Sequence, residues 1–310
     1  MTRHFLRDDD LSPAEQREVL ELAWQLKADR FSIRPLAGPK AVAILFDKPT
    51  LRTQVSFATA VIELGGYPLV VDGNLAQVGV RESVYDVTSV LTRQVSAIVW
   101  RTYGQQRIEE MAACATVPVV NALTDQFHPC QVLADILTVA EHLGGVDALA
   151  GTTLAYVGDG SFNMANSLLL GGTTAGMHVR IGAPTAYQPA ADMVAAATQI
   201  AASTGGSVQV VDNLDAAVAG ADVVVTDTWV SMGQQQEAAE REAQFLSFQV
   251  TTETMVAAGP NAIFLHCLPA YRGKEVTADV IDGPASRVWD EAENRLHTQK
   301  AILTWLLERV

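Results

Sequence analysis

The chain has 310 residues, of which 49% are hydrophobic and 18% are charged, a composition typical of globular proteins with sizeable cores. Its formal net charge of −14 argues against nucleic acid or an anionic membrane as a partner. No apolar run has the length of a membrane span, and the charged N-terminus lacks the apolar stretch of a signal peptide. Three cysteines without zinc-like spacing predict a reduced, cytoplasmic protein.

The first part of the chain predicts alternating helices and strands. Ser12-Pro13-Ala14-Glu15 is a capping-box pattern with proline at the first helical position, so a helix is expected over about residues 12–27. Strands are expected at residues 41–46, 68–71, 97–100 and 117–121. Helices fit at residues 108–115 and 129–142, and the second of these has an apolar stripe with helical spacing.

A second alternating series follows Gly144-Gly145. Strands are expected at residues 153–157, 179–181, 208–211, 223–226 and 263–266, and helices at 164–173, 190–203, 252–257 and 291–307. The polar segment between residues 226 and 251 is expected to be a mobile loop. Continuous β-branched runs suit strands that are buried on both faces. The fold class predicted is α/β, with two doubly wound parallel-sheet domains joined by long helices. At 310 residues, the chain is long enough for both.

In open α/β sheets, ligands bind beyond the carboxyl ends of the strands, so the residues after each expected strand are the candidates for chemistry. Six strand ends carry polar or reactive groups: Thr50-Leu51-Arg52-Thr53, Arg101, His128-Pro-Cys-Gln131, Gly158-Asp-Gly-Ser-Phe162-Asn163, Asp227 with Ser231-Met232-Gly233, and His266-Cys267-Leu268-Pro269.

The segment Thr50–Thr53 runs from an apolar strand into a helix. A helix start offers unpaired backbone N–H groups and a positive dipole end, and an arginine there grips a phosphate in a bidentate manner. The segment therefore predicts an anion site, while an N-capped helix with a surface arginine is the structural alternative. Each of the other residues also has a structural alternative when it is taken singly. Arg101 could be a surface charge and His128 a helix-cap residue. Cys267 could be a core residue, and Asp227 could cap a turn.

Three of these motifs, in this order and at this spacing, resemble the signatures of the ornithine carbamoyltransferase family. They are His128-Pro-Cys-Gln131, Asp227-x-x-x-Ser231-Met232-Gly233 and His266-Cys-Leu-Pro269, and the resemblance extends from Phe5-Leu-Arg7 to Glu291-Ala-Glu-Asn-Arg295-Leu-His-Thr-Gln-Lys300. The resemblance implies a carbamoyl-phosphate-binding domain over residues 1–130, with the helix 291–310 packing back on it. It implies an ornithine-binding domain over residues 131–290 and a homo-oligomer built from trimers.

The resemblance also implies roles for individual residues in moving a carbamoyl group from carbamoyl phosphate to the side-chain amine of L-ornithine. The donor is expected to be bound by Thr50, Leu51, Arg52, Thr53, Gln77 of a neighbouring subunit, Arg101, His128, Gln131, Cys267, Leu268 and Arg295. The acceptor is expected to be bound by Asn163, Asp227, Ser231 and Met232. Of these residues, the resemblance makes Arg52, Arg101, His128, Gln131, Asp227, Cys267 and Arg295 catalytic.

Carbamoyl phosphate is already an activated mixed anhydride, so no cofactor is expected. The six histidines lack paired ligand spacing, so no metal is expected either. The partners predicted are the two small-molecule substrates and further copies of the chain, without nucleic acid or membrane. Whether the reaction serves arginine biosynthesis, arginine breakdown or a specialised route stays open at this point.

The chain departs from the family pattern in three places. Leu51 and Gln54 stand where the family has a threonine and an arginine, Phe162 stands where it has an asparagine, and Tyr271 replaces the more common histidine. One hypothesis is a specialised sibling that carbamoylates a different diamino acid or amine, and the other is tolerated drift in an ornithine enzyme. A catalytically inactive regulatory subunit conflicts with the retained site residues.

A dinucleotide-dependent dehydrogenase is the remote alternative, because Gly158-Asp-Gly160 follows a strand. However, Asn163 stands where the third glycine of that fingerprint belongs, and no acidic residue follows the next strand.

Overall fold

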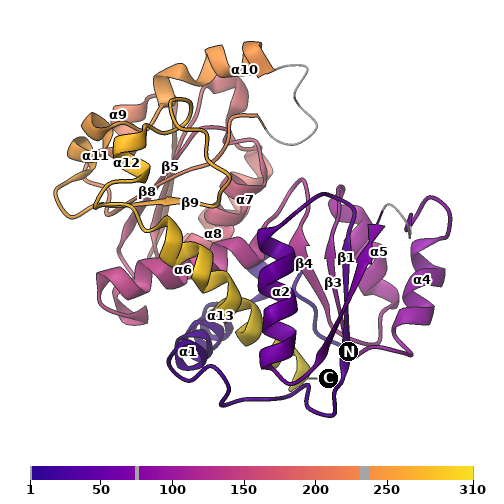
Figure 1. Cartoon of the computed structure of the whole chain (residues 1–310). Coiled ribbons are helices and arrows are strands. Elements are labelled where there is room, and N and C mark those ends of the chain that lie inside the picture. Colours follow the sequence, from indigo (N-terminus) through magenta and orange to yellow (C-terminus); the bar gives the residue numbers. More distant parts are fainter. Residues whose placement is uncertain (1, 74–76, 231–237, 310) are drawn as a thin grey trace. The chain divides into compact units, whose positions relative to one another are not determined.

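The computed structural model describes residues 2–73, 77–230 and 238–309, and the side chains of residues 238–240 are not described (Figure 1). The chain divides into two compact units. Unit 1 comprises Met1–Leu137 and Glu293–Val310, and unit 2 comprises Thr138–Ala292. No described helix is long and apolar enough to span a bilayer.

The described part of unit 1 contains a four-stranded parallel sheet in the order β2-β1-β3-β4. Its strands are β1 (Ala41–Phe46), β2 (Tyr67–Asp72), β3 (Ala97–Arg101) and β4 (Val119–Leu123). Its helices are α1 (Pro13–Ala28), α2 (Arg52–Glu63), α4 (Val84–Leu91), α5 (Gln105–Cys114) and the first part of α6 (Pro129–Leu143), together with the later part of α13 (Val288–Leu307).

The strand order decides where the helices of unit 1 lie. The chain steps from β1 to β2 in one direction and from β3 to β4 in the other. Because crossovers between parallel strands are right-handed, α2 and α5 lie on opposite faces of this sheet (Figure 1). The α5 face buries a core around Trp100, Ile98, Ile108 and Met111.

Helix α13 packs beside α1 within unit 1, as polar contacts along its length indicate. Lys27 Nζ donates to Asn294 Oδ1 over 2.8 Å, and Trp305 Nε1 donates to Glu18 Oε2 over 2.9 Å. The fully buried Lys300 ammonium donates to Glu63 Oε2 of α2 over 2.9 Å. These bonds join α13 to two other helices of the unit.

The described part of unit 2 contains a five-stranded parallel sheet in the order β7-β6-β5-β8-β9. Its strands are β5 (Thr153–Val157), β6 (His178–Gly182), β7 (Ser207–Val211), β8 (Val223–Thr226) and β9 (Ile263–His266). Its helices include α7 (Asn163–Thr174), α8 (Ala191–Thr204), α9 (Leu214–Val218), α10 (Ala238–Phe245), α11 (Thr252–Ala258) and α12 (Ala278–Ile281).

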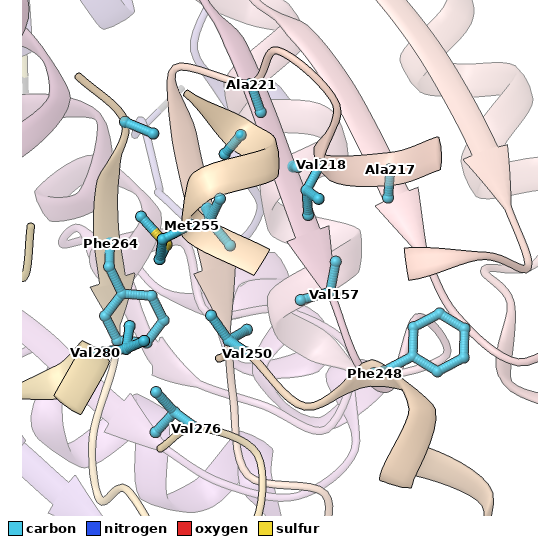
Figure 2. Close-up of a cluster of buried hydrophobic side chains, with 14 of the residues drawn as sticks. Val157, Ala217, Val218, Ala221, Phe248, Val250, Met255, Phe264, Val276 and Val280 are labelled. Atoms are coloured by element: carbon cyan, nitrogen blue, oxygen red, sulfur yellow. The ribbon is translucent and has the colours of Figure 1, made fainter. Parts of the chain in front are cut away.

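The α9 and α11 face of this second sheet buries an apolar cluster (Figure 2). Val157 and Phe264 from the strands pack with Val218 and Met255 from these helices, and Val280 of α12 completes this group. Burial on this scale stabilises an element by about 1.5–3 kcal/mol for each large side chain.

Both sheets reverse their strand order at an internal pair of strands, and such a switch point is where open α/β sheets bind ligands. In unit 1 the reversal lies between β1, which is followed by Arg52, and β3, whose last residue is Arg101. In unit 2 it lies between β5 and β8, which are followed by Asn163 and Asp227. The two reversals thus select four residues that the sequence singled out.

The α/β fold class with two parallel-sheet units is confirmed, and β1, β5, β8 and β9 have the expected bounds. The expectation of a loop across residues 226–251 is wrong in its later part. That part contains α10 and a short 3-10 turn, Leu246–Phe248. Strand β4 begins at Val119 and not at residue 117, directly after Pro118, which lacks a backbone donor.

Candidate active site

Thr53 is the meeting point of two arginines in unit 1. It is the second residue of α2 and is 1% exposed. Its Oγ1 atom accepts a hydrogen bond of 2.6 Å from Arg295 Nη2 and a longer one of 3.5 Å from Arg101 Nη1. Arg295 belongs to α13, 242 residues away along the chain. The structure therefore brings together three residues expected to bind the donor.

Arg52 lies at the first position of α2, where the helix dipole and the first N–H groups favour an anion. The preceding residue, Leu51, is the N-cap, and its side chain makes no capping bond and is 74% exposed. Thr50 is partly buried. The contribution of residue 51 to an anion site is therefore limited to its backbone.

His128 is a buried imidazole among cations. It lies directly before α6, and its backbone oxygen accepts from Gln131 N over 2.9 Å in the first turn. Burial lowers the pKa of His128 well below its ordinary value of 6.5, and the positive charges of Arg295, Arg101, Arg52 and Lys48 lower it further. The ring is thus neutral at physiological pH and has one N–H to donate.

Lys48 is a cation that the sequence analysis missed. Its side chain is 10% exposed, its ammonium pairs with the Asp125 carboxylate, and it lies 4.7 Å from the centre of the Tyr103 ring. Its position just before Thr50, at a strand end, could have identified it as a candidate site residue. No pattern in the sequence indicates its pairing with a residue 77 positions away.

Gln131 and Gln77, the other residues of unit 1 that are expected to bind the donor, differ in their exposure. Gln131 is buried in the first turn of α6, and its Nε2 donates to Asp135 Oδ1 over 2.8 Å. Its neighbour Cys130 donates its thiol to Asn121 O, and burial raises the pKa of this thiol, so it is unreactive. Gln77, by contrast, is exposed, with a left-handed φ of 46°.

In unit 2, Asp227 and Cys267 form a hydrogen-bonded pair at the ends of β8 and β9. Cys267 Sγ donates to Asp227 Oδ1 over 3.1 Å, and Thr228 N donates to the same oxygen over 2.7 Å. Neither of these donors uses the second oxygen, Oδ2. The pair presents a carboxylate and a sulfur atom, which suits an ammonium group.

The turn after Cys267 is held by a buried histidine. His266 Nδ1 accepts from Leu268 N over 2.9 Å, so the ring proton lies on Nε2 and points to Glu275 Oε1, 3.2 Å away. Glu291 Oε2 accepts from His266 N over 2.8 Å. Leu268 has a φ of 57°, an uncommon conformation for a residue with a side chain.

Potential metal ligands gather at the same place. Asp227, His266 and Cys267 each offer one ligand atom, and these three atoms lie within 4.8 Å of one another. Both ring nitrogens of His266 already take part in hydrogen bonds. A metal would have to replace one of them, so this arrangement favours a positioning role for the ring.

Asn163 is 8% exposed and begins α7, three residues after Gly160 of the turn that follows β5. Within that turn, Asp159 Oδ1 accepts from Ser161 N over 3.0 Å, and its Oδ2 pairs with Arg241 of α10. Arg241 Nε also donates to Trp229 O over 3.0 Å. Arg241 thus connects the segments on either side of residues 231–237 through its bond to Trp229, and its buried ion pair with Asp159 joins both to the turn after β5. Ser231 and Met232, both expected to bind the acceptor, lie outside the described residues.

Comparison with protein families assigns both halves of the chain. Residues 3–141 match the model of the aspartate/ornithine carbamoyltransferase carbamoyl-P binding domain, and residues 150–306 match the Asp/Orn binding domain of the same family. The chain belongs to the aspartate/ornithine carbamoyltransferase family. This membership removes the basis for the dinucleotide-dependent dehydrogenase alternative.

Several relatives in this family match nearly the whole chain. It is 63% identical over 309 residues to a protein of Clavibacter sepedonicus named ornithine carbamoyltransferase, with 100% of both chains covered. The ornithine carbamoyltransferase structure from Pyrococcus furiosus has a TM-score of 0.94 at 42% identity, covering 100% of this chain and 98% of that one. An anabolic ornithine carbamoyltransferase structure from Campylobacter jejuni has a TM-score of 0.92 at 32% identity, covering 99% and 100%.

Proposed function

We propose that the chain transfers the carbamoyl group of carbamoyl phosphate to the side-chain amine of L-ornithine, giving L-citrulline and phosphate. One observation carries the proposal from the structure. The pKa of the buried His128 is lowered by four cations, Lys48, Arg52, Arg101 and Arg295, in a chain whose net charge is −14. Such a concentration of cations against the overall charge suits a small dianion. Named relatives at 57–63% identity support ornithine as the acceptor.

Most of the donor-binding residues are assigned to unit 1. Arg52 and Arg101, with Thr50, Thr53, the backbone of Leu51 and the first N–H groups of α2, hold the phosphate. His128 and Arg295 donate to the carbonyl oxygen, where negative charge develops during attack. Gln131 and the backbone near Cys267 and Leu268 accept from the carbamoyl NH₂ group.

Acceptor binding is assigned to unit 2. Asn163 binds the α-carboxylate, while Asp227 with Ser231 and the segment at Met232 bind the α-ammonium. The side-chain amine of ornithine titrates near pKa 10, as a lysine does, so it loses a proton before it attacks. The new C–N bond then forms, the bond from carbon to the phosphate oxygen breaks, and phosphate departs with the electron pair and takes up the second proton that the attacking nitrogen loses. Cys267, close to Asp227, faces the amine without forming a covalent intermediate.

We also propose that the protein acts as a homotrimer. Strand β2 is an edge strand whose Tyr67, Leu69 and Val70 are 40–60% exposed, and monomeric proteins rarely leave such edges uncovered. The exposed turn at Gln77 follows this strand, which suits a residue that reaches a neighbouring copy. The occupant proposed for this surface is therefore a second copy of the chain.

A cytoplasmic role in arginine biosynthesis is the accompanying proposal. The relative from Campylobacter jejuni is named anabolic, and three free cysteines suit a reducing compartment. Restoring growth without arginine to a bacterial strain that lacks its own ornithine enzyme would test the biosynthetic direction. Failure of a well-expressed protein to restore growth would contradict it.

The activity is tested with a panel of amines. Initial rates of phosphate release from carbamoyl phosphate are measured with L-ornithine, L-lysine, 2,4-diaminobutyrate and L-aspartate. We expect the highest kcat/KM with L-ornithine. A clear preference for another diamino acid would instead support the specialised sibling.

A further inference from the structure

Asp47 is a buried carboxylate that directly follows β1 and receives three side-chain donors. Its Oδ2 atom accepts from Thr102 Oγ1 over 2.6 Å, from Trp100 Nε1 over 3.1 Å and from Arg107 Nη2 over 3.3 Å. The carboxylate is 8% exposed. Hydrogen bonds to ionised groups of this kind are stronger than those between neutral groups.

Asp47 joins the two segments that carry the phosphate-binding arginines. Its backbone N–H donates to Arg101 O over 2.9 Å, and its carboxylate holds Thr102, the next residue. Along the chain, Asp47 lies five residues before Arg52. The relative placement of Arg52 and Arg101 therefore depends on how firmly Asp47 is held.

Arg107 of α5 links Asp47 to a third segment. The same Nη2 atom donates to Val78 O over 2.5 Å, and the guanidinium lies 5.3 Å from the centre of the Trp100 ring. Val78 is 1% exposed and belongs to the turn in which Gly79 N donates to Glu82 O over 2.7 Å. Arg107 thereby holds the turn that begins at Gln77.

We propose that Arg107 is a positioning residue for carbamoyl phosphate, acting through Asp47 and not on the substrate. This inference rests on the proposed function. Arg107 fixes the base of the turn from Asp47 to Arg52 and the end of β3, and it fixes the turn at Gln77 through Val78. Its removal leaves the buried Val78 carbonyl without this donor and Asp47 without its charged partner, so the donor-binding groups lose their alignment.

Kinetics of the purified protein test the role, with Arg107→Met, Arg107→Lys and Asp47→Asn compared with wild type. Arg107→Met and Asp47→Asn should each raise KM for carbamoyl phosphate by about tenfold, as expected for the loss of a charge-assisted hydrogen bond. KM for L-ornithine at saturating donor should stay within about twofold, since no group of unit 2 is altered. Arg107→Lys should restore part of the donor affinity because an ammonium reaches one of the two acceptors.

A double-mutant cycle and a matched control separate positioning from general stability. Arg107→Met should add little in the Asp47→Asn background, because the two side chains act as one unit. The control is Arg93→Gln, which removes an exposed arginine from the same unit. It should leave both KM values unchanged.

Three results distinguish the outcomes. The positioning role would be overturned if wild type is active and Arg107→Lys, Arg107→Met and Asp47→Asn all have the wild-type KM for carbamoyl phosphate. Equal increases in both KM values with a lowered melting temperature in every variant would also overturn it, in favour of a purely structural role. A wild type that neither turns over nor binds carbamoyl phosphate would overturn the proposed function itself.

Discussion

At the scale of single residues, the neutral state of His128 makes the first prediction. His128→Ala should lower kcat by about 10²–10³, as the loss of an oxyanion donor does in other enzymes. His128→Gln keeps an N–H and should retain more activity. The pKa of His128 is well below 6.5 because of burial and the surrounding cations. Measured pH profiles of kcat/KM should therefore show no acid limb near 6.5 that depends on this residue. A limb at that pH that disappears in His128→Gln would contradict the assignment.

Arg241 makes the second prediction, for acceptor binding. It pairs with Asp159, and both side chains are less than 10% exposed, so Arg241→Gln leaves a buried carboxylate and costs about 3–5 kcal/mol of stability. Its bonds flank the segment with Ser231, so KM for L-ornithine should rise by about tenfold while KM for carbamoyl phosphate stays constant. The control is Glu242→Gln on the same helix, which breaks only a surface pair with Lys274.

Steady-state kinetics and thermal melts of both variants check this prediction. Equal effects of Arg241→Gln and Glu242→Gln on KM for L-ornithine would contradict it.

Sequence reasoning identified the site residues that stand at the end of a recognisable strand. Arg52, Asp227 and Asn163 follow apolar strands, so the strand-end rule found them. It missed Arg241 and the pairing of Arg241 with Asp159, 82 residues away. Nothing within one sequence indicates which buried charges pair across such a separation. The pairing follows from packing, which the order of apolar residues does not encode.

At the scale of elements, helix α13 predicts a pH dependence of stability. Burial, with a further contribution from the charge of Lys300, lowers the pKa of His297 from 6.5 to about 4. The unfolded chain therefore binds the proton first as the pH falls from 6.5 towards 4, and the folded state loses stability across that window. Melting temperatures between pH 8 and pH 4 should fall less steeply in His297→Gln than in wild type. Identical slopes in both proteins would contradict this assignment.

The elements also indicate where sequence patterns suffice. Strands β1, β5, β8 and β9 are continuous buried apolar runs, so their bounds could be predicted closely. Helix α10 was missed because half of its eight residues are polar and three of the others are alanine. Among its described side chains, the large apolar one is Phe245, which is fully buried and lies 4.7 Å from Tyr187, ring centre to ring centre. Its content of alanine and glutamate, which favour helices, was a local signal that could have identified it.

At the scale of the whole molecule, the proposed trimer rests on the exposed edge strand β2. Light scattering should give a mass of about three times the chain mass of 33.2 kDa. Leu69→Lys places a charge on the edge of β2, where lysine discourages strand pairing, and should lower the mass. Val256→Lys, at a site 74% exposed on α11 of unit 2, is the control and should not. A monomeric wild type would contradict the trimer.

The proposed reaction is the transfer of a carbamoyl group from carbamoyl phosphate to the side-chain amine of L-ornithine. The most direct measurement is the simultaneous quantification of citrulline and phosphate, by mass spectrometry and colorimetry, from carbamoyl phosphate and L-ornithine. The account predicts equal amounts of the two products in wild type and loss of both in Arg295→Met and Asp227→Asn. Phosphate released without citrulline, or citrulline formed at the wild-type rate by both variants, would contradict it.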